Sequence, residues 1–429
     1  MTGGGDTPSL NSTLYAIVKA AEDQDGEVLC FRRGWAGGLY PDKEYYVKVE
    51  KNGKLRLEKL RESTGEYVFL NSKDINPDQG GSIILSSRTN LEAIEGALED
   101  FSRRLKELRI DYFLPIGGDD TTTVTSRIIR EKILDNIPVM TVPKTIDNDN
   151  GKIGHDGKFN GLEAMINIWT PGFPTAVRNG RTFCDDTYTT AYTHEMVMWV
   201  ETMGRNAGWL ALAIGELAKA HMTIIPECPV KIEEVCRKAL ETYKQHGYFY
   251  GVIAQGAINA ETGMLIAEDK SLRDSFGNAK LGGAANVMAG IVKEYFKKND
   301  VYSPYFDWQV PGRMLRGGSP NRLDHESALK LGRHALLSVI NDSKVNGYMA
   351  VLLWNGKKAL PGHLPLEKAV CIDENGRIIP RQVPIDLETP ANGFYDPGTG
   401  KATELGRKYS EVLGVQKIKF APWVGEVYK

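Results

Sequence analysis

The sequence predicts an α/β protein with two Rossmann-like βαβ domains, parallel sheets and a ligand cleft between the two domains. Short apolar runs alternate with loops rich in glycine and aspartate and with helical segments, over residues 111–150 and again over 196–256. This alternation is typical of parallel strands joined by right-handed crossovers. The chain has 429 residues, of which 41% are hydrophobic, so it is long enough for two or three domains.

Composition and charge exclude several classes of protein. The formal net charge of −2 argues against nucleic acid or an anionic membrane as the main partner. No apolar run reaches the roughly 18 residues of a membrane span, and the first residues lack the basic start and apolar middle of a signal peptide. The five cysteines are odd in number and show no CxxC spacing, which indicates reduced thiols in a cytoplasmic protein.

The first part of the chain is expected to contain two helices and a β-hairpin. Apolar residues recur at helical spacing over 11–21 and, more strongly, over 91–108. Alternating residues at 45–49, a turn at Asn52-Gly53 and a returning run at 55–60 predict the hairpin.

A first candidate site follows the apolar run 111–116. The loop Gly117-Gly118-Asp119-Asp120 comes directly after this strand, and a helix is expected over 122–134. Glycines let the backbone approach an anion, and the start of a helix offers oriented N–H groups and the positive end of its dipole. The loop therefore predicts a phosphate site.

A second candidate site follows the next strand, 137–142. The stretch 143–149 reads Pro-Lys-Thr-Ile-Asp-Asn-Asp and leaves the carboxyl end of this strand, where open α/β sheets bind ligands. Asp119 and Asp147 are separated by one loop–helix–strand passage, so their loops should be neighbours. Two carboxylates beside an anion suggest Mg²⁺ on one and proton transfer by the other.

The second βαβ domain is expected after glycines at 151, 154, 157 and 161 mark a change of domain. The chain should return to the first domain near 312–318, continue through a helix over 324–341 and a strand over 347–354, and end in a tail from about 388. The predicted domains are 1–155 plus about 315–370, which would bind the phosphate donor, and 156–314 plus about 371–429, which would bind the acceptor. The expected strands are 196–203, 222–226 and 251–256, and the expected helices are 207–220 and 232–246.

Four motifs in this order resemble the phosphofructokinase family, and specifically its pyrophosphate-dependent branch. They are GGDD at 117–120, PKTIDND at 143–149, MGR at 203–205 and RGGSP at 316–320. The ATP-using branch typically has glycine in place of Asp120 and Lys144. Asp120 puts a negative charge where a nucleotide would place a further phosphate, and Lys144 adds a point charge suited to a short, dense anion.

The resemblance implies a glycolytic phosphotransferase that uses Mg²⁺, works in the cytoplasm and forms a homodimer or homotetramer, with its active site in the cleft between the domains. Asp147 would accept the proton of the attacking hydroxyl. The implied catalytic residues are Asp147, Lys144, Asp120 and Arg205; the donor would bind Gly4, Arg88, Gly118, Lys144 and Thr145; the acceptor would bind Thr145, Asp147, Met203, Gly204, Arg205, Gln255, Arg313 and Arg316; and Mg²⁺ would bind Asp119 and Asp149.

The first residues also match the family. Gly3-Gly4-Gly5 resembles its first phosphate-binding loop, which normally follows a strand, whereas only Met1 and Thr2 precede it here. A start site placed too late or a truncated chain is the simplest explanation. Arg88 stands where the family keeps an arginine for the transferring phosphate.

Four positions depart from the family pattern on the acceptor side. Met196 and Asp307 stand where arginines usually bind the sugar's 6-phosphate, Gln255 replaces an acidic residue that binds sugar hydroxyls, and Arg313 replaces a histidine or tyrosine. A phosphate needs forked cationic donors, so these changes put fructose 6-phosphate in question as the acceptor.

Three alternatives therefore stay open. The acceptor could be a different sugar or sugar phosphate, or a polyol. The chain could be a non-catalytic regulatory subunit, although such chains usually lose the aspartates present here. Each site residue also has a structural alternative: Asp119 as a helix cap, Asp149 as a turn residue and Arg205 as a surface arginine.

Overall fold

The computed structural model describes residues 1–39, 45–51, 54–61, 67–134, 136–150, 152–153, 161–273, 279–301, 304–342, 344–381, 385 and 393–420. Two compact units can be distinguished. The first contains residues 1–144, 328–351 and 361–380, and the second contains residues 145–327, 352–360 and 381–429. The domain boundary predicted near residue 155 lies outside the described residues. Among the helices of the described ranges, none is long and apolar enough to cross a membrane.

The sheet of the first unit is built from β5 (Ile116–Gly117), β6 (Met140–Pro143) and the start of β15 (Tyr348–Trp354). β5 pairs with β6 and β6 with β15, both in parallel. Met1 and Thr2 lie beside β5, because the Ile116 N–H donates to the Met1 carbonyl and the Gly3 N–H to the Ile116 carbonyl, at 2.9 and 2.8 Å. The predicted parallel arrangement is therefore confirmed in this unit.

The predicted hairpin is also present, as the antiparallel pair β2 and β3. The turn residues expected at 52–53 lie outside the described residues. The further elements of the unit are α1 (Leu10–Glu22), β1 (Val28–Phe31), α2 (Trp35–Leu39), β2 (Tyr45–Lys51), β3 (Lys54–Arg61), β4 (Tyr67–Leu70), η1 (Ser72–Asp74), η2 (Leu91–Ala93), α3 (Ala97–Glu107), α4 (Asp119–Arg130), η5 (Leu366–Lys368), β17 (Val370–Ile372) and β18 (Ile378–Pro380).

The single helix predicted over 91–108 is wrong at its start. A short 3₁₀ turn covers Leu91–Ala93, and the α-helix begins only at Ala97. Gly96 interrupts the two with φ of 71°, a left-handed conformation that a continuous helix cannot contain. The apolar face still packs inward, where Phe101 contacts the rings of Trp35 and Phe113 at 5.2 and 5.3 Å between centroids.

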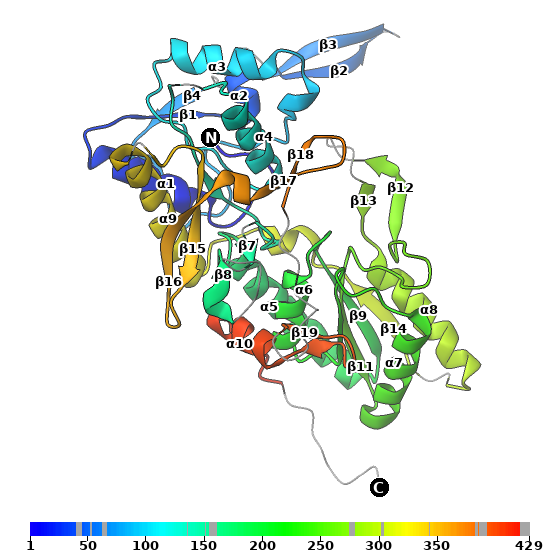
Figure 1. Ribbon diagram of the computed structural model, residues 1–429. Coiled ribbons are helices and arrows are strands. Elements are labelled where there is room, and N and C mark those ends of the chain that lie inside the picture. Colours follow the sequence, from blue (N-terminus) through cyan, green and yellow to red (C-terminus); the bar gives the residue numbers. More distant parts are fainter. Residues whose placement is uncertain are drawn as a thin grey trace. The chain divides into compact units, whose positions relative to one another are not determined.

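The second unit contains a parallel sheet in the order β10-β11-β9-β14. The pairings of β10 with β11, β11 with β9 and β9 with β14 are all parallel, as predicted for the second βαβ domain. Helices α5 and α6 lie on one side of this sheet and α7 and α8 on the other (Figure 1). These elements are α5 (Phe173–Thr193), β9 (Val197–Thr202), α6 (Trp209–Leu217), β10 (Met222–Ile224), α7 (Ile232–His246), β11 (Phe249–Ala254), α8 (Ala284–Lys298) and β14 (Phe306–Gln309).

The core between the sheet and α7 and α8 explains the apolar character of the strands. Trp199 and Phe249 are fully buried and their rings lie 5.1 Å apart between centroids. Strands covered on both faces are expected to read as continuous apolar runs. The remaining elements of the second unit are β7 (Lys152–Ile153), η3 (Leu162–Ala164), β8 (Met165–Ile166), β12 (Glu268–Arg273), β13 (Ala279–Leu281), η4 (Gly312–Arg316), β19 (Tyr395–Asp396), β20 (Lys401–Ala402) and α10 (Glu404–Val412).

Three elements continue from one unit into the other along the chain: α9 (Arg322–Asn341), β15 and β16 (Ala359–Pro365). Within the second unit, the end of β15 pairs with β8 in antiparallel fashion through Leu353 and Ile166.

Candidate active site

The glycine loop at the start of the chain is closed by Lys144. The Gly4 N–H donates to the Ser87 carbonyl at 3.0 Å, which places the loop beside the segment that carries Arg88. The Lys144 ammonium donates to the Gly5 carbonyl, and a Cβ built on Gly4 would lie 3.3 Å from it. Gly4 has φ of 82°, which favours glycine. The first unit therefore brings Gly4, Lys144 and the backbone next to Arg88 together.

The GGDD loop lies on the same sheet edge. The Lys144 N–H donates to the Gly117 carbonyl at 2.9 Å. A Cβ on Gly117 would lie only 2.1 Å from the Thr121 hydroxyl oxygen, so only glycine allows the strand to turn into α4 here. α4 begins at Asp119, not at Thr122 as predicted, so Asp119 and Asp120 belong to its first turn. Carboxylates are stabilised there by the helix dipole.

The stretch 145–149 has a rigid frame and one accessible carboxylate. Asn148 is buried with φ of 57°; its amide oxygen accepts from the Thr170 N–H at 2.8 Å, and its amide nitrogen donates to the Tyr409 hydroxyl at 2.7 Å. The Thr145 hydroxyl accepts from the Asp147 N–H at 3.1 Å. Asp147 itself is half-buried, so its carboxylate is held in place but can still be reached.

The residues MGR and Gln255 meet at the carboxyl end of the second unit's sheet. The Gln255 N–H donates to the Thr202 carbonyl at 2.9 Å, and the Gly256 N–H donates to the Gly204 carbonyl at 3.0 Å. Gly204 has φ of 133°. Parallel strands present their carboxyl ends at one edge, and that is why two motifs about fifty residues apart share this position.

Glu201 supports this edge, and sequence reasoning missed it. Its carboxylate accepts from the N–H groups of Gly283 and Ala285 at 2.9 and 3.2 Å, which joins the end of β9 to the start of α8. Burial raises the pKa of this carboxyl above its usual range. A charged residue near the end of an otherwise apolar strand was the signal that could have identified it.

Arg313 and Arg316 belong to η4, a 3₁₀ turn, and the backbone around them is held by α5. The Asn179 amide donates to the carbonyls of Met314 and Gly317, each at 3.0 Å. Arg313 is exposed and Arg316 half-buried.

The structure places the departing positions Met196 and Asp307 near adjacent strands. Asp307 pairs in register with Met198 on β9, two residues after Met196. The Asp307 carboxylate accepts from the Trp308 N–H at 2.7 Å and from the Gln309 amide at 3.3 Å. It therefore presents carboxylate oxygens at a position where the sequence comparison with the family led us to expect a cation.

Gly256→Ala is expected to disturb the sheet edge formed by residues 203–205 and 255, which the sequence predicts to bind the acceptor. A Cβ at residue 256 would lie 1.8 Å from the Arg205 carbonyl oxygen, so the MGR loop would have to move. We expect KM for the acceptor to rise by roughly tenfold or more while KM for the donor changes little, together with a stability loss of about 1–3 kcal/mol. Gly290→Ala in α8 is the matched control, since the added Cβ meets nothing within 4 Å apart from its own helix backbone and chain neighbours. Equal KM values for Gly256→Ala and the unsubstituted chain would contradict the placement of this edge.

Known proteins resemble this chain over most of its length. A family model described as Phosphofructokinase matches residues 1–339. The ATP-dependent 6-phosphofructokinase of Mycobacterium tuberculosis (strain ATCC 25618 / H37Rv) is 31% identical over 341 residues, which cover 78% of this chain and 84% of that protein. The pyrophosphate–fructose 6-phosphate 1-phosphotransferase of Amycolatopsis methanolica is 32% identical over 342 residues, with coverages of 79% and 86%.

Solved structures agree on the fold. The pyrophosphate-dependent phosphofructokinase of Marinobacter aquaeolei superimposes with a TM-score of 0.70 at 18% identity, covering 98% of this chain and 92% of that one. The protein of the same description from Nitrosospira multiformis gives the same TM-score. With a family model over most of its length and curated relatives above 30% identity, the chain belongs to the phosphofructokinase family.

Proposed function

We propose that this chain transfers a phosphoryl group from pyrophosphate to a hydroxyl of a sugar phosphate, with fructose 6-phosphate as the first acceptor to test. One observation carries the choice of donor: the Lys144 ammonium lies against the Gly3–Gly5 loop, in contact with the Gly5 carbonyl. A cation at this place suits a diphosphate, which concentrates its charge within a few ångströms. The relatives carry names of both donor classes, so the donor rests on Lys144 and Asp120.

The donor would bind in the first unit. Backbone N–H groups of the glycine loops and the first turn of α4 would contact phosphate oxygens, and Lys144 and Arg88 would neutralise their charge. Asp120 is exposed on the first turn of α4. There it would repel the additional phosphate of a nucleotide.

The acceptor would bind in the second unit. Asp147 would take the proton of the attacking hydroxyl, and Arg205 would contact the transferring group or the acceptor. Thr145, Gln255 and the backbone of Met203 and Gly204 would orient the acceptor. Arg313 and Arg316 would replace the missing arginines in binding a sugar phosphate.

The residues present also fit Mg²⁺. Asp119 supplies a half-buried carboxylate beside the N–H groups of α4, and Asp149 supplies a buried one in the second unit. Among the described residues, no group of three or more histidine, cysteine, aspartate or glutamate side chains is placed so that it could hold a metal ion. Mg²⁺ often keeps several waters and binds one or two carboxylates and substrate phosphates, so a sparse protein donor set suits it. When bound, Mg²⁺ neutralises charge on the phosphates.

A second acceptor class has its own observation in favour. Asp307 stands where an arginine for the 6-phosphate is expected, and Gln255 stands where an acidic residue is expected. Both side chains would suit hydroxyls of an unphosphorylated sugar or a polyol.

Turnover of the purified protein with Mg²⁺ tests both parts. Pyrophosphate and ATP are each supplied with fructose 6-phosphate and with a panel of free sugars and polyols. Turnover with pyrophosphate and fructose 6-phosphate at a micromolar KM is expected. Turnover only with ATP would contradict the donor, and turnover with pyrophosphate on free sugars or polyols alone would contradict the acceptor. Absence of turnover with every pair would favour the regulatory subunit.

A further inference from the structure

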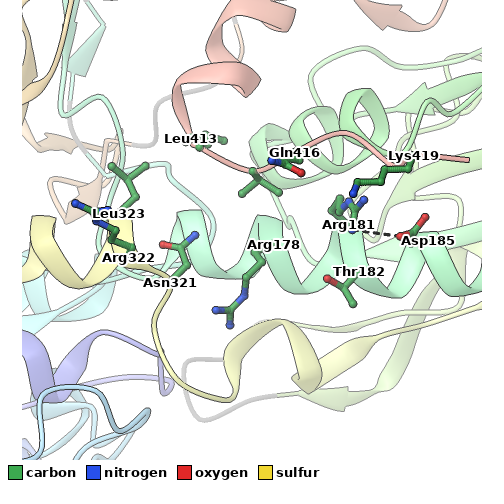
Figure 2. A pocket seen from close by; sticks show the side chains of 12 residues that line it. Arg178, Arg181, Thr182, Asp185, Asn321, Arg322, Leu323, Leu413, Gln416 and Lys419 are labelled. Carbon is green, nitrogen blue, oxygen red and sulfur yellow. Dashed lines mark ion pairs between the residues drawn. The ribbon is translucent and has the colours of Figure 1, made fainter.

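A cavity in the second unit is lined by none of the residues assigned to phosphoryl transfer. Its volume is about 470 Å³, which is in the range of small-molecule sites. Three segments far apart in sequence line it: the middle of α5, the start of α9 and the tail that follows α10 (Figure 2). Four of its lining residues are cationic and one is acidic: Arg178, Arg181, Arg322, Lys419 and Asp185.

Two of the four cations already have carboxylate partners. Arg181 forms an ion pair with Asp185, one turn along α5, at 3.3 Å. Arg322 forms an ion pair with Glu326 at 2.7 Å, and its side chain is 92% exposed. These pairs leave little charge for a ligand, although the Arg181 Nε is buried and makes no hydrogen bond in the described structure.

The other two cations, Arg178 and Lys419, have no carboxylate oxygen within 4 Å among the residues that the structure describes. Lys419 is exposed on the tail. Arg178 is half-buried, and burial lowers the pKa of its guanidinium. The Asp324 carboxylate acts on Arg178 in the opposite direction and compensates part of this burial cost, and a bound anion would compensate the rest. The lining of the cavity therefore keeps an excess of positive charge, carried by Lys419 and in part by Arg178.

The wall that carries Lys419 is fixed to the rest of the unit. The Ile418 N–H donates to the Leu217 carbonyl at 2.9 Å, and Ile418 is buried. Lys417 forms an ion pair with Glu216 at 2.6 Å, and Arg181 donates to the Lys417 carbonyl at 3.1 Å. A cavity with anchored walls is organised before a ligand arrives, which lowers the entropic cost of binding.

Arg178 also contacts the segment that carries the proposed acceptor arginines. One of its terminal nitrogens donates to the Ser319 carbonyl at 2.9 Å, and Figure 2 shows the side chain extending from α5. The next residue, Asn179, holds the carbonyls of Met314 and Gly317. A ligand that binds the Arg178 guanidinium is thus linked to residues 313–320 through the Arg178 side chain.

We propose that this cavity binds a phosphate monoester and that its binding orders residues 313–320. A phosphate monoester carries a charge of about −1.5 to −2 at neutral pH, which the excess positive charge of the lining would attract. The Nε and one terminal nitrogen of Arg178 already donate to the Asn179 amide oxygen at 3.2 and 2.9 Å, so its other terminal nitrogen and the Lys419 ammonium would contact the phosphate oxygens. The Gln416 amide and the Thr182 hydroxyl also line the cavity and would orient the organic part.

The test is hydrogen exchange of the whole chain with glycerol 3-phosphate as the probe and glycerol as its neutral control. We expect the phosphate to slow exchange in peptides covering 178–185, 413–419 and 313–320, and glycerol to have no effect. Lys419→Gln should weaken the protection of 178–185 and 413–419 by roughly fivefold to tenfold in apparent Kd. Lys408→Gln, an exposed lysine of α10, should leave it unchanged.

Several outcomes would overturn the proposal. Equal protection in Lys419→Gln and the unsubstituted chain would exclude the cavity as the site. Protection of 313–320 that persists in Lys419→Gln while 178–185 is unaffected would show binding at residues 313–320 and not in the cavity. Citrate binding more tightly than glycerol 3-phosphate would reject a phosphate in favour of a carboxylate ligand. None of these readouts depends on turnover, so they remain interpretable if the proposed reaction fails.

Discussion

Asp147→Asn is expected to lower turnover by roughly 10²–10⁴-fold, the range for removal of a general base. Asparagine keeps the size of the side chain and loses the carboxylate that would accept the hydroxyl proton. The local frame should survive, because it relies on the Asp147 backbone N–H and the Asn148 side chain, and the asparagine oxygen can still accept the long 3.5 Å hydrogen bond from the Thr145 hydroxyl. Steady-state kcat with the best donor and acceptor, together with the thermal unfolding midpoint, measures both effects.

The control for this substitution is Asp186→Asn, which removes an exposed carboxylate from α5 in the same unit. It should retain turnover. If Asp147→Asn kept kcat within about threefold of the unsubstituted chain, another group would have to accept the proton. A large loss of kcat accompanied by a fall of many degrees in the unfolding midpoint would instead show that Asp147 supports the fold.

The parallel sheet of the second unit could be predicted because its strands are buried on both faces. β9 and β11 have no exposed residue, so each is mostly apolar and is followed by a loop that contains glycine. The residues placed at such ends, including Arg205 and Gln255, could be predicted for the same reason. Arg205 and Gln255 lie at the same sheet edge because of the direction and pairing of β9 and β11 alone.

Helix α5 was not predicted, and its sequence explains why. It spans Phe173–Thr193 and contains several threonines, a glycine and paired aspartates, all of which are weak helix formers. Tertiary packing stabilises it instead. Gly180 allows close contact with Ile214, since an added Cβ would lie 2.2 Å from that side chain, and the fully buried Cys184 faces inward.

The residues that support the site, Glu201 and Asn148, could not be predicted from sequence patterns. Glu201 acts through N–H groups more than eighty residues away, and Asn148 acts through Tyr409 near the other end of the chain. Each looks ordinary in its local context, as a strand residue or a turn residue. The phosphate-monoester cavity combines three segments in the same way, so only folded coordinates bring its cations together.

Asp120→Gly is expected to raise the ratio of kcat/KM for ATP to kcat/KM for pyrophosphate by about tenfold or more. Removing a charge about 4 Å from a phosphate changes the interaction by roughly 1–4 kcal/mol near a protein surface, and the change should favour the longer donor. The helix should tolerate the change, because Asp120 is exposed on the first turn of α4.

Lys144→Ala should act on the other donor and with a larger effect. The Lys144 ammonium is the buried cation against the Gly3–Gly5 loop, so its loss should lower kcat/KM for pyrophosphate by roughly 10²–10³-fold and change that for ATP much less. Lys144→Arg keeps both the positive charge and a long side chain, whereas Lys144→Ala removes both. Lys144→Arg should therefore retain more pyrophosphate turnover than Lys144→Ala. A parallel fall for both donors in Lys144→Ala would show that the lysine supports the loop and does not select the donor.

If Asp120→Gly also left the donor ratio unchanged, the first unit would discriminate between donors by the shape of its loops, and the assignment to pyrophosphate would lose its physical basis.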